Sequence, residues 1–228
     1  MLNRRKGGFT KAILGATIMV GLASTPALTS TVAPGATGVA PDTFVTNPGT
    51  LLASVSSTLP ALTFTASYTE SVYRATGLTN GLCGGCINLV IQVSNSGQAL
   101  ITGEIDEISA FNMGSFITDA GINTALGSGV NPIDLSRTGD GTALNFNFSS
   151  GTLTPGKSTA FLEIETNAIN FGPGTVSAID GSSFTGPGFS PLTPVTTPLP
   201  AALPLFAGGL GALGVLGWRR KRKAAAAA

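Results

Sequence analysis

Three short stretches of the sequence carry residue types that could do chemistry. The first, "GTLTPGKS", places Gly151, Gly156, Lys157 and Ser158 at the spacing of a phosphate-binding loop. Such a loop joins a strand to a helix, whose N-terminus receives the phosphates. Here the following "TAFLEIET" alternates apolar and polar residues as a strand does. We therefore predict a hairpin turn at Pro155-Gly156, with Lys157 and Ser158 opening the next strand.

The second stretch, "LCGGC", contains Cys83 and Cys86, two residues apart. A thioredoxin-like redox pair would lie at the start of a helix in a βαβ unit, and no such unit is indicated here. A zinc site would need further Cys or His ligands, and the sequence has no His and no other Cys. In an exported protein this pair favours a disulfide. Its very short loop would contribute only about 2 kcal/mol, so we expect it to pin the end of a hairpin.

The third group consists of carboxylates. Glu104, Asp106 and Glu107 lie close together, and Glu163 and Glu165 share one face of a predicted strand. Paired carboxylates can act in glycoside hydrolysis or bind calcium, but a solvated strand face is the usual case, and that is our interpretation here. A catalytic triad is disfavoured because the chain has no His. We predict a non-enzymatic protein with no catalytic residue, cofactor or metal site.

The two ends of the chain indicate where these residues are placed in the cell. Basic residues precede a short apolar stretch over 12–23, which is typical of a Sec-type signal peptide. We predict a signal peptide over 1–27, handled by the Sec translocon and removed by signal peptidase after Ala27. A second apolar run, 201–218, would cross most of a roughly 30 Å hydrocarbon core as a helix. Five basic residues then hold the terminus in the cytoplasm: Arg219, Arg220, Lys221, Arg222 and Lys223.

Charge is distributed unevenly along the chain. Nine of the twelve basic residues lie in the two end segments, whereas all eleven acidic residues lie between them. The part between the ends therefore has a net charge of about −8, from three basic and eleven acidic residues. Such a charge disfavours nucleic acid and anionic membrane surfaces as partners.

The part between the ends reads as one all-β domain, residues 28–185. An irregular leader over 28–60, with one strand at most, precedes period-2 alternation that begins at Leu62. Further strands are predicted over 87–93, 99–108, 144–148, 160–166 and 175–179. Turn signals separate them at Asn80-Gly81, Ser96-Gly97, Asp140-Gly141, Pro155-Gly156, Pro173-Gly174 and Asp180-Gly181.

These features predict an antiparallel β-sandwich of about seven to nine strands, either immunoglobulin-like or jelly-roll-like. The segment 111–126 is compatible with a short helix or with a long loop across the edge of the sandwich. The Pro- and Thr-rich segment 186–197 is predicted to be an extended stalk, because proline does not join a central strand.

The end of the chain resembles a known class of sorting signal. Thr197 and the following Pro198, Leu199, Pro200 and Ala201 resemble the VPLPA variant of the PEP-CTERM signal, with Thr197 at the position that is usually Val. Over 198–228 the apolar run and the basic terminus follow at the spacing of that class.

The resemblance implies a Gram-negative bacterium, recognition and cleavage by an exosortase-type membrane protease, and delivery from a membrane-anchored precursor to the cell surface or a polysaccharide matrix. It predicts a structural or adhesive protein with exopolysaccharide as a partner. A secreted carbohydrate- or calcium-binding module is the alternative. The many glycines of the apolar run favour a transient, cleavable span over a permanent anchor.

Overall fold

The structure is a computed structural model that describes residues 31–77, 79–97 and 103–194. These residues form eleven strands: β1 (Asp42–Phe44), β2 (Thr50–Pro60), β3 (Thr65–Arg74), β4 (Ile87–Asn95), β5 (Glu107–Phe111), β6 (Thr118–Asn123), β7 (Asp134–Arg137), β8 (Ala143–Asn147), β9 (Leu162–Thr166), β10 (Ala168–Asp180) and β11 (Ser182–Pro194). No helix occurs among them, so none of the described segments is a helix able to span a membrane. The predicted signal peptide and C-terminal sorting segment lie outside the described residues.

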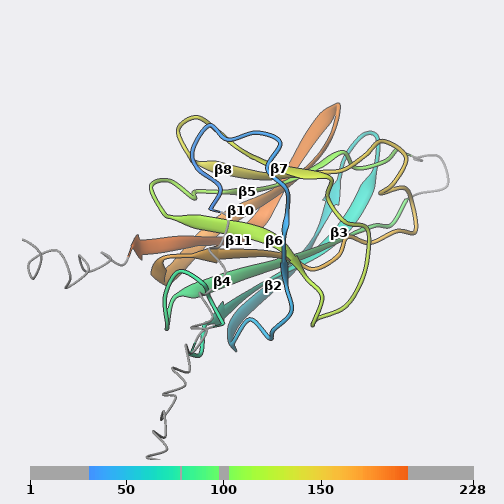
Figure 1. Ribbon diagram of the computed structural model, residues 1–228. Helices are drawn as coiled ribbons and strands as arrows, with labels where there is room; N and C mark the ends of the chain where they lie inside the picture. The colour runs from blue at the N-terminus through green and yellow to red at the C-terminus, as the bar shows by residue number, and fades with distance from the viewer. Residues whose placement is uncertain (1–30, 78, 98–102, 195–228) are drawn as a thin grey trace, which may run out of the picture.

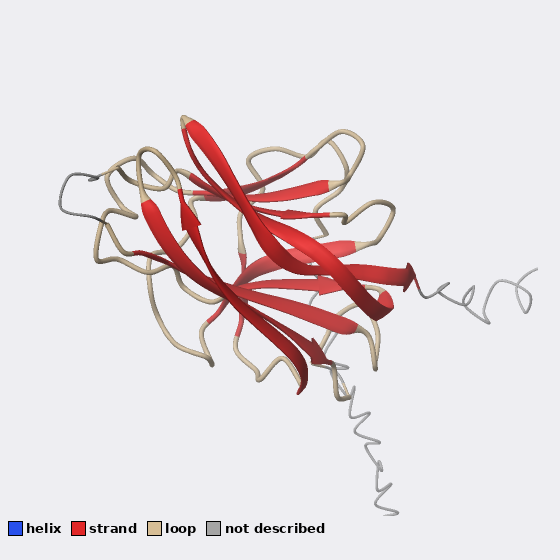
Figure 2. Cartoon of the chain, turned by 180° about the vertical axis from the view of Figure 1, so that it is seen from behind, coloured by secondary structure: helices blue, strands red, loops and turns tan. Residues whose placement is uncertain are grey.

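The strands form two sheets that lie against one another (Figures 1 and 2). Sheet A has six strands in the order β1-β6-β9-β4-β3-β2, and sheet B has five in the order β11-β10-β5-β8-β7. All neighbouring strands are antiparallel except β1 and β6, which are parallel. The predicted all-β class is confirmed, and the two sheets are consistent with the predicted sandwich.

One apolar core lies between the sheets. Sheet A contributes fully buried side chains such as Leu89 and Ile164, and sheet B contributes Ile108 and Phe146. These residues come from strands with period-2 alternation, which places every second side chain on the same face. Burial of each large aliphatic or aromatic side chain stabilises the fold by about 1.5–3 kcal/mol.

Several predicted strands and turns are confirmed. Strands β4 and β10 cover the predicted runs 87–93 and 175–179, and β8 and β9 overlap most of the predicted runs 144–148 and 160–166. The predicted strand over 99–108 was largely wrong for the residues described, because 103–106 are not in a strand and only 107–108 belong to β5. The turn at Asp140-Gly141 joins β7 to β8, and Gly181 joins β10 to β11 with a positive φ of 60° that favours glycine. Alternation of apolar and polar residues therefore located strands whose apolar side chains face the core.

The N-terminal leader is more ordered than predicted. Instead of one strand at most, residues 28–60 contain β1 and the eleven-residue β2, which pairs with β3 along its whole length. The outward side chains of β2 are Ser54, Ser56 and Thr58, paired with Ser71, Thr69 and Ser67. Because small hydroxyl side chains alternate here with few apolar ones, the period-2 signal was weak.

The prediction for 111–126 was also incomplete, because this segment contains β6, which is neither a helix nor a loop. β6 lies inside sheet A, between β1 and β9. Its sequence, "TDAGIN", mixes small and polar residues that alternate poorly. Its position in the sheet depends on neighbours that are distant in the sequence.

The predicted stalk and the predicted turn at Pro173-Gly174 were wrong for the residues described. β10 continues through Pro173 and Gly174, and residues 182–194 pair with it as β11 in a long hairpin, drawn in orange in Figure 1. The prolines are accommodated because β11 is an edge strand, with a neighbour on one side only. Proline has no N–H group to donate to a second neighbouring strand, and at the edge no such donor is needed.

Candidate functional site

The "GTLTPGKS" segment lies between β8 and β9 and forms turns. Gly151 and Gly156 have φ values of 80° and 83°, and strand β9 follows, as predicted for a turn and not for a phosphate-binding loop. Lys157 and Ser158 do not open β9, which begins at Leu162. Ser158 instead forms an isolated bridge to Ser94 on β4.

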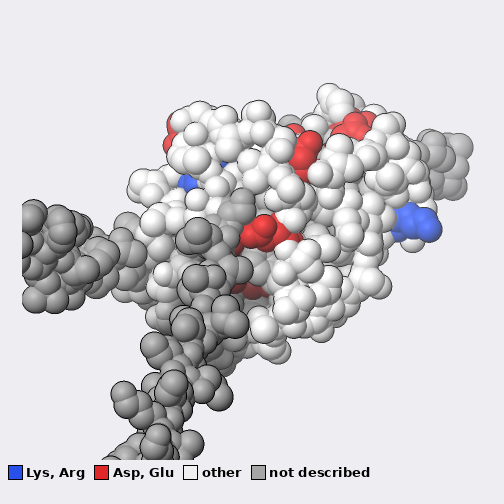
Figure 3. All heavy atoms as spheres, viewed as in Figure 1, with Lys and Arg blue, Asp and Glu red and all other residues white. Residues whose placement is uncertain are grey.

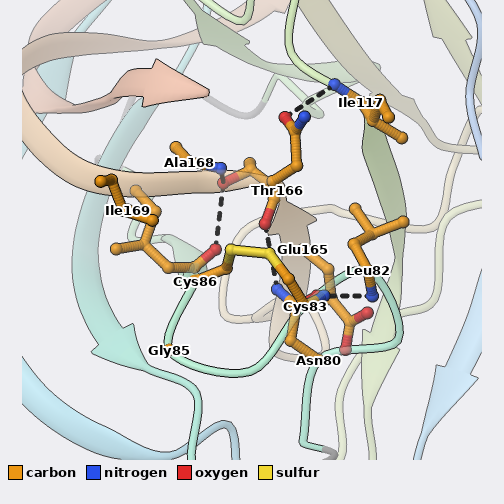
Figure 4. Close-up of a disulfide and its surroundings, with 12 residues drawn as sticks. Asn80, Leu82, Cys83, Gly85, Cys86, Ile117, Glu165, Thr166, Ala168 and Ile169 are labelled. Carbon is orange, nitrogen blue, oxygen red and sulfur yellow. Dashed lines mark hydrogen bonds between the residues drawn. A yellow bond between two sulfur atoms is a disulfide. The ribbon is translucent and has the colours of Figure 1, made fainter. Parts of the chain in front are cut away.

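Cys83 and Cys86 form a disulfide, as predicted, with Cα atoms 5.6 Å apart. The bridge lies in the loop that joins β3 to β4, immediately before β4 begins (Figure 4). The amide of Ala75 donates to the carbonyl of Cys86 at 2.8 Å, and Arg74 Nη1 donates to the carbonyl of Gly85, also at 2.8 Å. The disulfide thus stabilises the loop at the end of the hairpin that β3 and β4 form.

We expect the double substitution Cys83→Ser, Cys86→Ser to leave the domain folded. Its free energy of unfolding should fall by about 2 kcal/mol, because the bridge closes a very short loop and removes little entropy from the unfolded chain. Urea unfolding measures the loss, and thiol labelling before and after reduction checks that the native protein has no free thiol. Loss of the folded state in the double variant would contradict the limited role of the bridge.

Glu163 and Glu165 of β9 do not lie on a solvated face, contrary to the prediction. They share the outer face of sheet A, but their side chains are only 1% and 3% exposed. Asp119, which pairs with Glu165 from β6, is fully buried as well. We call Glu163, Glu165 and Asp119, together with Asp42 of the adjacent β1, the carboxyl cluster.

Loops that are distant in the sequence cover this cluster. Asn88 Nδ2 donates to Glu163 Oε1 at 3.0 Å and also to the carbonyl of Pro48 at 3.1 Å. Asn123 Nδ2 donates to Glu163 Oε2 at 2.5 Å and to the carbonyl of Thr46 at 2.8 Å. Each asparagine therefore ties the carboxyl group of Glu163 to the segment between β1 and β2.

The disulfide loop covers the other end of the carboxyl cluster (Figure 4). Figure 4 shows Glu165 beside this loop. The amide of Gly81 donates to Glu165 Oε2 at 2.8 Å. Asn80 Nδ2 donates to the carbonyl of Thr166 at 3.2 Å and to Asn88 Oδ1 at 2.6 Å. The loop between β3 and β4, which contains the disulfide, is thus fixed on top of β9.

Burial changes the acidity of these groups. Desolvation, together with the charges of Asp42 and Glu165, raises the pKa of Asp119 to about 8. Desolvation likewise raises the pKa of Glu163 and that of Glu165 to about 7, in spite of the hydrogen bonds from Asn123 and Gly81. The cluster therefore holds protons at neutral pH, which limits the repulsion between its members.

The other acidic group of the sequence does not form one site. Glu104 accepts hydrogen bonds from Ser150 Oγ and from the amide of Gly151, and Glu107 accepts from Ser109 Oγ at 2.7 Å. Desolvation, followed by the charges of Glu104 and Asp180, raises the pKa of Asp106. Among the residues that the structure describes, no three His, Cys, Asp or Glu residues are arranged to hold a metal ion.

Sequence analysis missed two buried charged groups. Glu70 of β3 points into the space between the sheets, where its Oε2 accepts a hydrogen bond from the amide of Phe189 at 2.8 Å. Arg137 of β7 is 3% exposed and donates to the backbone carbonyls of several loops. The sequence did contain an indication that Arg137 has a specific role, because it is one of only three basic residues between the two ends of the chain.

A polar hollow of about 360 Å³ lies on the outer face of sheet A, over β2, β3 and β4. Its outward-facing side chains lie on two neighbouring rungs of paired residues. They are Thr58, Ser67 and Ser94 on one rung and Ser56, Thr69 and Gln92 on the other.

A second hollow, of about 260 Å³, continues the first along β3 and β4 and shares Thr69 and Gln92 with it. Its other lining residues are Ser71, Tyr73, Val90, Leu126 and Phe161. We call the two hollows together the hydroxyl groove. None of the described residues that line it is Asp, Glu, Lys or Arg.

Comparison with protein-family models, with curated proteins and with solved structures gave no match to this chain.

Proposed function

We propose that this chain is an exported, non-enzymatic protein of the envelope of a Gram-negative bacterium, with a structural or adhesive role at the cell surface or in a polysaccharide matrix. The observation that carries the proposal is the disulfide between Cys83 and Cys86, because such bonds persist in oxidising compartments outside the cytoplasm. The basic and apolar segments at both ends of the sequence agree with that location.

The fold supports a binding or scaffolding role in this location. Two antiparallel-rich sheets enclose one core, which suits a sandwich of the immunoglobulin-like or jelly-roll-like kind. The charge of the exported part is strongly negative, and most of the face viewed in Figure 3 is uncharged. Such a surface favours contact with uncharged partners over contact with nucleic acid.

Processing of the C-terminus by an exosortase-type protease is part of the proposal. Proline excludes the helix and biases the preceding residue toward extended backbone, so Pro198-Leu199-Pro200 would present an extended peptide of the kind that proteases bind. The basic residues 219–223 would hold the terminus in the cytoplasm until cleavage.

We expect the mature protein from its native host to end near Ala201 and to lack Trp218. Replacing both Pro198 and Pro200 with Ala should leave a full-length, membrane-bound form, whereas the same double change at the exposed Pro34 and Pro60 should not affect C-terminal processing. Mass spectrometry of C-terminal peptides, combined with cell fractionation, decides the question. Intact peptides through Arg219 in fully exported protein would show that the tail is a permanent anchor, and a cytoplasmic protein would overturn the proposed function.

A further inference from the structure

The hydroxyl groove is an extended surface whose described lining residues carry no charge. Its long direction follows β3 from Ser67 to Tyr73, which at about 3.3 Å per residue spans about 20 Å. The groove has enough length for several units of a polymer. Both of its hollows are open to solvent on the outer face of sheet A. A polymer can therefore bind along its length without passing its end through a closed channel.

The polar groups of the groove are held in place before any ligand arrives. Ser56 Oγ and Thr69 Oγ1 are 2.8 Å apart, and Ser54 Oγ and Ser71 Oγ are 3.0 Å apart. Gln92 Nε2 donates to the carbonyl of Thr159 at 3.4 Å, which orients the amide group. Fixed polar groups reduce the entropy that binding costs.

The type of polar group indicates the type of ligand. A hydroxyl both donates and accepts hydrogen bonds, and an amide side chain offers one group of each kind. Such a lining matches a ligand whose own groups both donate and accept, as the hydroxyls of a sugar do. A phosphate, sulfate or carboxylate would instead favour cationic side chains or the N–H groups of a helix N-terminus, and the described residues that line the groove offer neither.

One end of the groove adds an apolar platform. Tyr73 of β3 and Phe161, just before β9, line the second hollow together with Leu126. Aromatic side chains offer a large, rigid apolar face on which the C–H groups of a sugar ring can pack. An extended peptide, by comparison, adds to the edge of a sheet through its backbone and gains little from hydroxyls on the face.

We propose that the hydroxyl groove binds a segment of an uncharged polysaccharide, with hydroxyls and Gln92 as its hydrogen-bonding partners and Tyr73 and Phe161 as its apolar platform. The net charge of about −8 between the two ends of the chain repels acidic polymers and so adds to the selectivity for neutral ones. The inference rests on the proposed function only for the location where protein and polysaccharide meet.

Native gels that contain a soluble polymer test this binding. The full-length chain, purified in detergent, should migrate more slowly in gels with dextran, mannan or soluble β-1,3-glucan, in at least one case. Alginate can also bind the nine basic residues at the two ends of the full chain, so any retardation by alginate should be the same in Tyr73→Ala as in the original chain. Mobility is compared with that in a gel without polymer, so that changes of charge in the variants cancel. Retardation by none of the neutral polymers, or retardation by alginate that Tyr73→Ala abolishes, would overturn the proposal.

Two substitutions test the site itself. Gln92→Glu places a charge in the groove and Tyr73→Ala removes its aromatic side chain, so each should weaken the apparent affinity at least ten-fold. Thr185→Glu, at an exposed position on β11, is the matched control and should bind as the original chain does. Thermal unfolding verifies that all three variants are folded. Unchanged binding in both groove variants would place the polysaccharide elsewhere and refute the assignment.

The outcomes separate this inference from the proposed function. A matrix-located protein that binds no neutral polymer would refute the groove and leave the proposed location intact. A cytoplasmic protein that binds dextran through Tyr73 would refute the proposed location and leave the groove intact.

Discussion

Raising the pH from 5 to 8 is expected to lower the free energy of unfolding of the domain by several kcal/mol. The groups responsible are buried carboxyls with raised pKa values, namely Glu70 and Asp119 at about 8 and Glu163 and Glu165 at about 7. In the unfolded chain the same groups lose their protons near their ordinary values of 4.5 and 3.8. At pH values between the unfolded and the native pKa values, the native state binds more protons than the unfolded state. The free energy of unfolding therefore falls as the pH rises.

Glu70 offers the clearest test, because it lies in the core, apart from the carboxyl cluster. Its Oε1 has no hydrogen-bond partner, and desolvation dominates the rise of its pKa in spite of the hydrogen bond from Phe189. Glu70→Gln keeps an acceptor for that amide and is uncharged at every pH. At about 1.4 kcal/mol per pKa unit, we expect the variant to be more stable than the original protein by about 3 kcal/mol at pH 8 and nearly equal to it at pH 5.

Urea unfolding at pH 5, 6, 7 and 8 measures this effect. Asp140→Asn is the control, because hydrogen bonds from Thr138 and Thr142 lower the pKa of that exposed carboxyl to about 2, and its charge therefore stays constant over the whole range. Asp140→Asn should change the free energy of unfolding by the same amount at every pH, so that its decline from pH 5 to 8 keeps the same slope. A stability that is flat or rises from pH 5 to 8 in the original protein would show that the buried carboxyls are ionised in the native state.

Arg137→Met is expected to lower the free energy of unfolding by about 4 kcal/mol or to prevent accumulation of folded protein. Arg137 Nη1 donates to the carbonyl of Val32 at 2.9 Å, and Nη2 donates to those of Gly114 and Phe116 at 3.0 Å and 2.9 Å. Nε donates to Gly141 at 3.1 Å. One side chain thus satisfies carbonyls of three separate segments, and each buried carbonyl that loses its donor costs about 1–3 kcal/mol.

Two further variants define the effect of Arg137. Arg137→Lys keeps the charge but replaces a planar fork with a single ammonium group, so it should recover only part of the loss. Arg74→Met is the matched control, because Arg74 donates to only two carbonyls, those of Gly85 and Ile169, in a more exposed place. We expect Arg74→Met to cost about 1 kcal/mol. A loss of similar size in Arg74→Met and Arg137→Met, measured by urea unfolding, would refute the special role of Arg137.

The sequence predicted the parts of this fold in which local pattern and burial agree. β4 combines apolar alternation with clear boundaries and was located well, whereas the serine-rich β2 and the proline-containing β11 were not. Pairing in the sheet, and not local preference, holds those two strands. The disulfide was predictable because only one pairing exists for two cysteines.

The buried carboxyls were not predictable from local pattern. Glu163 and Glu165 alternate with Leu162 and Ile164 as exposed residues usually do, and only the distant segments 46–48 and 79–81 cover them. One usable signal was present. Asparagine is disfavoured in strands, so Asn88, which lies in the apolar first half of β4, indicates a polar partner on that face.

The position of β11 has a consequence for the timing of secretion. Tyr68 donates to the carbonyl of Pro187, and Glu70 accepts from the amide of Phe189, so β3 lacks both partners until the last described strand is present. Sheet A is equally dependent on late segments, because β9 joins β4 to β6. On the proposed route, in which the N-terminal end crosses the membrane first, the domain completes its fold only after residue 194 has emerged. Non-local pairings form slowly, so a pause of the tail in the membrane would give the domain time to fold before its release.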